Sequence, residues 1–461
     1  LMASTYITRT PSSAGNRRKF TISMWVKRVK LGVDQWLVQA GASGSEFDIR
    51  FTTSDTLRFS TWDGSNGYGM ITTRVFRDTS AWYHLVFQYD TAQATDTNRN
   101  KIYVNGEQIS PSDTSAYNAG KHPPQNYDNP SWNNTTAFRI NDVTWTSSSP
   151  KDAVYSHIHH TDGYAYDAST FGSTDSTTGE WKIKTSPSVT YGTNGFFILK
   201  DGNSVTDQSG NSNNFTVGGG TLTNTEDCPS NVFATLNPLI VFANTRYSNG
   251  NLTAGRNSGE PWGNALSTLA MRGSGKFYWE NRLDSSTNGS GHNPLQVGIQ
   301  SFNDGSDATF ADLQIDGGLA NSTFGASNYI WRNQGGAVTK FHNTTSTTWG
   351  VAVTPGNIIM TAFDVANGKI WWGRNGTWFS SGSYVGDPAS GTYEAFSGIS
   401  TTTDWFPVCA VEESYTSFNF GNGYFGTTQI TSEGTNASGI GKFEYDVPTG
   451  YTALSTKGLN L

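Results

Sequence analysis

Glu46 and Asp48 are the residues whose type and spacing come closest to a catalytic arrangement. They lie two positions apart in SEFDIRF, a strand-like stretch, so we expect both carboxylates on one face. Retaining glycosidases use two carboxyl groups about 5–5.5 Å apart. Arg50 follows on the same face, and we expect it to pair with the carboxylates and keep both ionised, which leaves no proton donor. The pattern therefore favours an exposed, ion-paired strand over a catalytic pair.

Histidines form the second candidate group. His157 and His159 are spaced to share one strand face, and His160 follows them, but no third ligand stands at a definable spacing. A hydrogen-bonded or solvent-facing pair is therefore favoured over a metal site. The chain also contains no G-x-S-x-G elbow and no Gly-rich phosphate loop. We predict a protein without catalytic residues and without a cofactor.

Aromatic residues in the predicted loops are better candidates for binding. Flat rings beside Asn, Asp and Gln can stack on sugar rings, but they also suit contacts between subunits or simple packing within a sandwich. All three interpretations stay open. The candidate binding residues are Trp62, Tyr68, Tyr127, Trp132, Tyr329, Trp331 and Trp405.

The composition excludes several functional classes. Charged residues make up only 15% of the 461 residues, whereas aromatics reach 13% and glycines number 51. This mixture is typical of short strands joined by polar turns and is not typical of disordered chains. The net charge of -7 argues against binding of nucleic acid through phosphate contacts. Cys228 and Cys409 lie far apart, and we expect both to be free thiols.

Alternating apolar residues and turn signals predict an all-β chain. Phe20, Ile22, Met24 and Val26 alternate with polar or mixed positions, which predicts a half-buried strand. The segment 81–90 is apolar on both faces and predicts a central strand. In the second half, 364–379 contains two Asn-Gly pairs, at 367–368 and 375–376, which predict tight hairpin turns. We expect its tryptophans to form the spine of a second sandwich.

The first 175 residues resemble the laminin-G-like, concanavalin-type jelly roll. The resemblance is carried, in order, by FTISMWVKR, WYHLVFQYDTA, NKIYVNGEQI and VYSHIHHTDGYAYDASTFG. It implies that the last of these strands returns to pair with the first. Domains of this family often bind one calcium at a loop rim, for which Asp63 with Asn66, or Asp96 with Asn98, could supply oxygens. Neither spacing is distinctive, and Asx turns are the simpler interpretation.

Residues 270–426 resemble a SPRY domain, a bent β-sandwich used as an interaction module. The matching motifs are GKFYWE, NGKIWWGRNGTWF and FNFGNGYFG, in the family's order. The fold class is therefore expected to be all-β, with two tandem β-sandwich (jelly-roll) domains and a Gly/Asn-rich β connector. We expect a jelly roll with appended strands over 1–227, the connector over 228–270, the SPRY-like sandwich over 271–430, and a docking tail over 431–461.

This combination resembles fibre, appendage and capsid-fibre proteins of marine tailed bacteriophages. The resemblance implies a non-enzymatic structural virion protein that contacts host surface glycans and assembles as a homo-oligomer or with other virion proteins. No signal peptide, transmembrane segment or membrane insertion is expected. The implied location is the virion, outside the cell after lysis. The alternatives are a bacterial extracellular adhesin or filament subunit, and a glycoside hydrolase on a jelly-roll fold.

Overall fold

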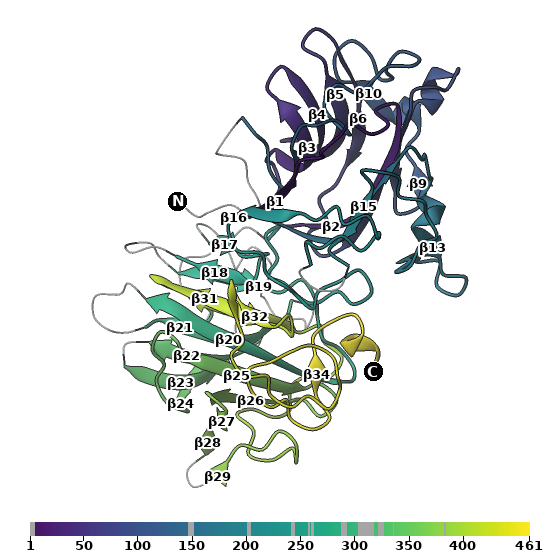
Figure 1. Cartoon of the computed structure of the whole chain (residues 1–461). Coiled ribbons are helices and arrows are strands. Elements are labelled where there is room, and N and C mark those ends of the chain that lie inside the picture. Colours follow the sequence, from purple (N-terminus) through teal and green to yellow (C-terminus); the bar gives the residue numbers. More distant parts are fainter. Residues whose placement is uncertain are drawn as a thin grey trace. The chain divides into compact units, whose positions relative to one another are not determined.

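The chain folds into two compact units that are built almost entirely of strands (Figure 1). The computed structural model describes residues 5–145, 152–200, 204–240, 245–256, 259, 262–286, 293–302, 318–320, 327–334, 336–381 and 384–461. Unit 1 comprises residues 1–224 with 228–230, and unit 2 comprises 225–227 with 231–461. Helical structure in the described residues consists of short 3-10 turns: η1 (Asp96–Asn98), η2 (Pro111–Asp113), η3 (Ala168–Thr170) and η6 (Gly458–Asn460). None of these is long and apolar enough to cross a membrane.

Unit 1 is a sandwich of an eight-stranded and a six-stranded sheet. The first has the order β10 (Thr114–Ala116), β6 (Gly67–Val75), β5 (Thr56–Trp62), β4 (Ser45–Phe51), β3 (Gln35–Ala42), β11 (Phe138–Ile140), β1 (Tyr6–Arg9) and β16 (Thr216–Gly219). The second has the order β15 (Phe196–Ile198), β12 (Ala153–Asp162), β2 (Lys19–Arg28), β7 (Trp82–Asp90), β8 (Asn100–Val104) and β9 (Glu107–Gln108).

The expected pairings of the jelly roll are confirmed. β12 pairs antiparallel with β2, so the late strand does return to the first one, and β15 extends the same sheet. β7 lies between β2 and β8, which agrees with its apolar character on both faces. These pairings hold the sheet that packs against β3–β6 through one continuous apolar core.

The expectation that β2 is only half buried is wrong, because a second layer covers its outer face. Phe20, Ile22, Met24 and Val26 enter the core as predicted. On the other face Trp25 stacks on His84 of β7, and Trp181 donates its indole N–H to His84 Nδ1 at 2.9 Å. Trp181 belongs to a hairpin that lies over this sheet, formed by β13 (Gly172–Thr174) and β14 (Trp181–Ile183).

Unit 2 is also a two-sheet sandwich. One sheet has the order β17 (Arg246–Ser248), β18 (Thr253–Gly255), β31 (Ser414–Asn419), β20 (Lys276–Ser286), β25 (Ile358–Asp364), β26 (Lys369–Arg374) and β27 (Thr377–Trp378), with β34 (Thr452–Ala453) also paired to β20. The other has the order β19 (Gly263–Leu266), β30 (Phe406–Val411), β21 (Leu295–Gln300), β22 (Asn328–Gln334), β23 (Ala337–His342) and β24 (Thr345–Thr348). Two small hairpins are β28 (Ser380–Ser381) with β29 (Tyr384–Val385), and β32 (Tyr424–Phe425) with β33 (Thr428–Gln429).

The two Asn-Gly turns around β26 differ from each other. Asn375 and Gly376 both have positive φ, 50° and 84°, and connect β26 directly to β27 as predicted. At the other turn only Gly368 has positive φ, and four residues separate β25 from β26. Asn367 instead binds the Asp364 carboxylate through its backbone N–H and its side-chain amide. The tight two-residue turn expected at this end is therefore wrong.

The segments on either side of the central sandwich strands are integrated into unit 2. Residues 228–270, expected to be a connector, contribute β17, β18 and β19 to its two sheets. The tail expected over 431–461 supplies β34 and buries Phe443 and Tyr451 against Tyr278 and Trp371. Sheet pairing and apolar contact thus hold both segments in this unit.

A buried carboxylate fixes the tail to β20. Glu280 accepts hydrogen bonds from the Tyr445 N–H at 2.9 Å and the Glu444 N–H at 3.0 Å. The Tyr278 hydroxyl (2.9 Å) and the Asn419 amide (3.1 Å) complete the set of donors. Burial raises the pKa of Glu280 to about 7, and the four donors counteract this rise only in part.

We predict that Glu280→Ala destabilises unit 2 by about 3 kcal/mol or more, because four buried donors lose their acceptor. Chemical denaturation measures this loss, and limited proteolysis should show earlier cleavage within 431–461. Because the pKa of Glu280 is raised above its unfolded value, its contribution is largest at acid pH and declines as the pH rises through about 7. Glu433→Ala, on an exposed residue of the same tail, is the control. Equal stability of the two variants would contradict the assignment.

Candidate functional site

Four of the seven candidate binding rings are buried in the cores, so packing within the sandwich is the one of the three open interpretations that fits them. Trp132 is 0% exposed and stacks on Phe138 with ring centroids 4.1 Å apart. In unit 2 the buried rings are Tyr329, Trp331 and Trp405. The indoles of Trp331 and Trp405 donate to the backbone carbonyls of Trp349 and Ser400. These four residues fill the sandwiches and present no ring face to a ligand.

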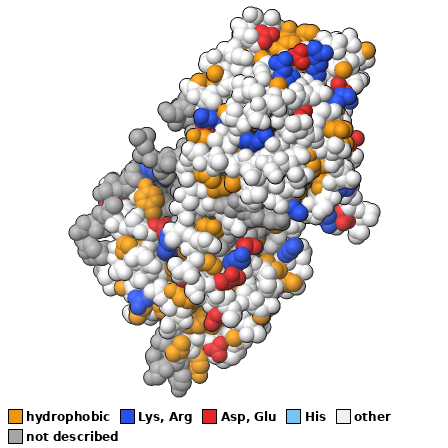
Figure 2. Space-filling view, viewed as in Figure 1, with side chains coloured by type: hydrophobic (Ala, Val, Ile, Leu, Met, Phe, Trp, Pro, Cys, Tyr) orange, Lys and Arg blue, Asp and Glu red, His pale blue; other side chains and the backbone are white. Residues whose placement is uncertain are grey.

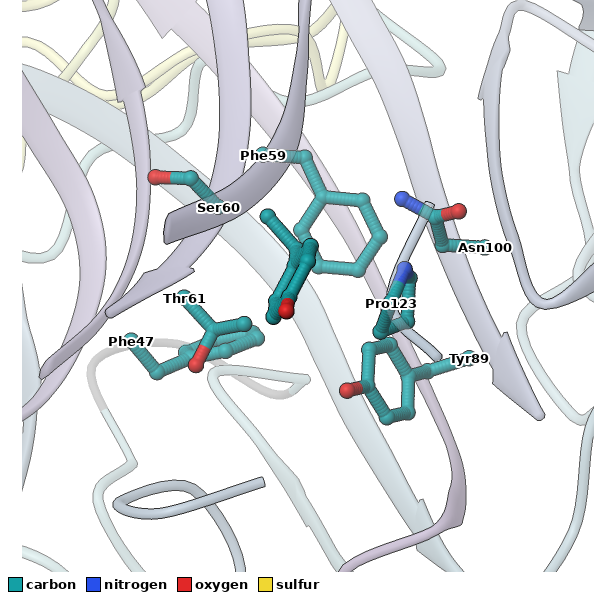
Figure 3. Close-up of a pocket in the computed structure, with 8 residues that line it drawn as sticks. Phe47, Phe59, Ser60, Thr61, Tyr89, Asn100 and Pro123 are labelled. Atoms are coloured by element: carbon teal, nitrogen blue, oxygen red, sulfur yellow. The ribbon is translucent and has the colours of Figure 1, made fainter. Parts of the chain in front are cut away.

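Tyr68 and Tyr127 are half-buried and lie together in unit 1. Their rings meet edge to face with centroids 5.3 Å apart. The Tyr127 hydroxyl donates to the Asp63 carboxylate at 3.2 Å, and burial raises the pKa of Tyr127. The pair closes one end of the core beside a hollow of about 10 Å³, which has room for one water molecule. The hollow is lined by Phe47, Phe59, Ser60, Thr61, Tyr68, Tyr89, Asn100 and Pro123 (Figure 3).

Trp62 lies on the opposite face of the same sheet, where its ring and that of Tyr117 both lie close to Gly67. The strand register places Trp62 opposite Gly67 of β6, and Tyr117 follows β10, which pairs with β6. A methyl group on Gly67 would come within 2.8 Å of both rings. Because glycine has no side chain, there is room for Trp62 and Tyr117 at this position. Both rings are half-buried. We call Trp62, Tyr117, Arg58 and Glu46 the aromatic platform.

Ion pairs and a cation–π contact hold Arg58 and Tyr117 of the platform in position. Arg58 Nη2 lies 2.9 Å from the Asp48 carboxylate and 3.8 Å from the Glu46 carboxylate. Its guanidinium also lies over the Tyr117 ring, 3.6 Å from the centroid. Ser60 donates a further hydrogen bond to Asp48. Arg58 of β5, which is separated from β10 by β6, thus holds the position of Tyr117.

The expected role of Arg50 is wrong, because Arg58 binds the carboxylate pair. Arg50 instead lies 3.7 Å from Asp34 and packs over the Trp36 ring. Asp48 is fully buried, so the strand is ion-paired but not exposed as expected. Burial, together with the charge of Asp48, raises the pKa of Glu46. Only Glu46 of the two carboxylates reaches the half-exposed surface.

Figure 2 shows hydrophobic, basic and acidic side chains close together over the end of unit 1 where Figure 1 labels β4, β5, β6 and β10. The platform residues come from β4, β5 and the segment after β10. The sequence indicated Trp62 as a candidate binding residue, but it did not indicate Tyr117 or Arg58. Arg58 alternates with Ser60 and Trp62 along β5, which was a usable signal. The position of Tyr117 depends on the β6–β10 pairing, for which the sequence held no comparable signal.

The histidines do not form the chelating pair that their spacing could allow. β12 bulges between Ser156 and His159, and His157 adopts a positive φ of 48°. Nδ1 of His157 hydrogen-bonds with Ser156 Oγ, and Nδ1 of His159 with the Tyr191 hydroxyl. Their hydrogen bonding agrees with the favoured interpretation. No group of three His, Cys, Asp or Glu side chains in the described part of the chain could hold a metal ion.

The loops considered for calcium form local turns. Asp63 Oδ1 accepts the N–H groups of Ser65 and Asn66, which is an Asx turn. Asp96 Oδ1 accepts the N–H of Thr97 at the start of η1. Both cysteines are free thiols as expected, and Cys409 is buried. Burial raises the pKa of the Cys409 thiol, which makes it a poor nucleophile.

Comparison with known proteins supports the fold of unit 1. Residues 2–153 match the model of the Concanavalin A-like lectin/glucanases superfamily. This match and the antiparallel sandwich agree on a concanavalin-type jelly roll. No curated protein matches the chain.

Solved structures similar to this chain include SPRY domains. The PSpry domain of TRIM65 is 14% identical, with a TM-score of 0.29, and the match covers 40% of this chain and 87% of that one. The SPRY domain of human HERC1 is 16% identical, with a TM-score of 0.28, and the match covers 40% of this chain and 96% of that one. Stonustoxin is 14% identical, with a TM-score of 0.28, and the match covers 41% of this chain but only 28% of that one. Scores this low say nothing about function.

We predict that acid destabilises unit 1 through its buried histidines. Burial lowers the pKa of His160 to about 4 and that of His84 to about 3. Below about pH 6.5 these histidines bind protons in the unfolded chain but stay neutral in the folded unit. The free energy of unfolding therefore falls as the pH drops toward 4. His160→Phe, in a pocket of aromatic rings, should reduce the slope of unfolding free energy against pH by about one proton. An unchanged slope, measured by denaturation between pH 4 and 7, would contradict this.

Proposed function

We propose that this protein is a non-enzymatic structural and adhesive virion protein, a phage fibre or appendage subunit that contacts host cell-surface glycans. The observation that carries the proposal is the aromatic platform. Two half-exposed rings lie side by side on one sheet face, with Glu46 beside Trp62 in the strand register. A sugar ring needs an apolar face to stack on and nearby polar groups for its hydroxyls, and this platform provides both.

The platform is also rigid, which favours ligand binding. Arg58 is fixed by Asp48 and packs against Tyr117, and Trp62 has its place beside Gly67. A site that is already ordered loses little conformational entropy when the ligand binds. The Tyr68–Tyr127 pair is less suited to bind a sugar, because its rings contact each other and the Tyr127 hydroxyl donates its hydrogen bond to Asp63.

We predict that Trp62→Ala and Tyr117→Ala each weaken glycan binding by about tenfold or more, since each removes a stacking surface. Binding of the whole chain to an array of bacterial surface polysaccharides, followed by titration of the strongest ligand, measures the effect. Tyr164→Ala removes a ring that is 40% exposed elsewhere in unit 1 and should leave binding unchanged. If the wild-type chain binds no glycan, or binds equally well without either platform ring, this role is excluded.

A glycoside hydrolase is the second candidate, because the raised pKa of Glu46 would suit a general acid. Asp48 argues against it: the carboxylate that would act as nucleophile or base is buried and paired with Arg58. Release of reducing ends from the bound polysaccharide, abolished by Glu46→Gln, would favour the hydrolase. Binding without release favours the adhesive role.

The location of the protein separates the virion role from that of a bacterial adhesin, a third possibility that both folds allow. Antibodies against the purified chain should label particles released by lysis when viewed by electron microscopy. Labelling confined to the surface of intact cells would favour the adhesin.

A further inference from the structure

The exposed edge of unit 2 combines an open strand with apolar side chains. β24, with the sequence TSTT, is the last strand of its sheet, and in the described part of the chain it pairs only with β23. All four of its residues are exposed. Edge strands of soluble proteins are often protected by Lys, Pro, a bulge or a short length, and β24, with four residues, has only its short length.

The direction of the free backbone groups follows from the register. The Trp349 N–H donates to the Val338 carbonyl at 3.1 Å, so Trp349 belongs to the positions that bond inward to β23. Inward and outward positions alternate in an antiparallel pair. Ser346 and Thr348 therefore direct their backbone N–H and C=O groups away from the sheet.

An apolar patch adjoins this edge. Val351, three residues beyond β24, is 47% exposed, and Val385 and Tyr393 are 56% and 45% exposed. The backbones beside Val351 and Val385 both approach Phe379. Its ring would lie 2.7 Å from a methyl group on Gly350, and its carbonyl accepts the Gly386 N–H. Figure 2 shows hydrophobic side chains at the end of the unit where Figure 1 labels β28 and β29.

Tyr393 is held in a strained conformation inside this patch. Its φ of 56° is unusual for a bulky residue. The neighbouring backbone fixes it from both sides, because Thr392 exchanges hydrogen bonds with Asp387 and Ala395 donates to Ile370. A methyl group on Gly386 would lie 3.3 Å from the Tyr393 carbonyl, so the backbone that follows Val385 runs close to the backbone of Tyr393. Rigid exposed tyrosines of this kind are common in protein interfaces.

We propose that β24 and the patch of Val351, Val385 and Tyr393 form a self-association surface, on which the β24 strands of two copies pair antiparallel about a two-fold axis. The axis would pass through Thr347, so that Ser346 of each copy lies opposite Thr348 of the other. This pairing satisfies the outward backbone groups of both strands, and the absence of charge on β24 avoids repulsion. A second copy is the occupant that fits, because an uncharged edge strand is complementary to itself.

The inference deepens the proposed function, on which its biological use as subunit assembly rests. Its test is nevertheless separate from glycan binding. Sedimentation velocity of the full chain across a wide concentration range should show a reversible monomer–dimer equilibrium. Ser346→Lys places two lysines at diagonal positions of the paired strands, within reach of each other, and should raise the dissociation constant about tenfold or more. Val351→Ser, which leaves the edge itself intact, should weaken the dimer less.

The matched control is Val217→Lys. Val217 is 45% exposed and lies in β16, an edge strand of unit 1 that is also uncharged. A monomer at all concentrations, a dimer that tolerates both unit 2 substitutions, or a dimer lost only in Val217→Lys would each overturn the proposal. So would loss of glycan binding, with unchanged mass, in Val351→Ser. Circular dichroism and thermal unfolding establish that each variant is folded.

Discussion

Large aromatic side chains fill the cores of both units, and most features of the structure depend on how those rings are packed. In unit 1 Trp132 stacks on Phe138 and lies against Phe47. In unit 2 Trp279, Trp371 and Trp372 are fully buried. In a close-packed core each large ring needs space that its neighbours leave free. The same requirement creates the platform, where Gly67 leaves room for Trp62 and Tyr117.

This packing also explains why the sequence predicted the fold better than the site. Alternation in FTISMWVKR and the apolar segment 81–90 were enough to predict β2 and β7, because a period of two follows directly from strand geometry. An aromatic residue between polar loop residues carries no such information. Trp132 and Trp405 come from loop-like segments, yet both turn inward, because contacts distant in sequence decide their burial.

The charged pairs show the same limit. Spacing along one strand correctly placed Glu46 and Asp48 on a shared face with a cation beside them. It selected Arg50, whereas the cation that binds them comes from β5, across the register. Likewise the Asn-Gly pair at 375–376 specifies its turn, while the pair at 367–368 is overridden by hydrogen bonds to Asp364. Local signals hold where no neighbour competes with them.

Glu280 and His160 are both buried ionisable groups, but burial shifts their pKa values in opposite directions. Burial raises the pKa of Glu280, so unit 2 loses stability as the pH rises toward about 7, and burial lowers the pKa of His160, so unit 1 loses stability as the pH falls toward about 4. Each unit has its own core. The two buried groups therefore shift the pH of greatest stability of the two units in opposite directions, toward acid for unit 2 and toward neutral pH for unit 1.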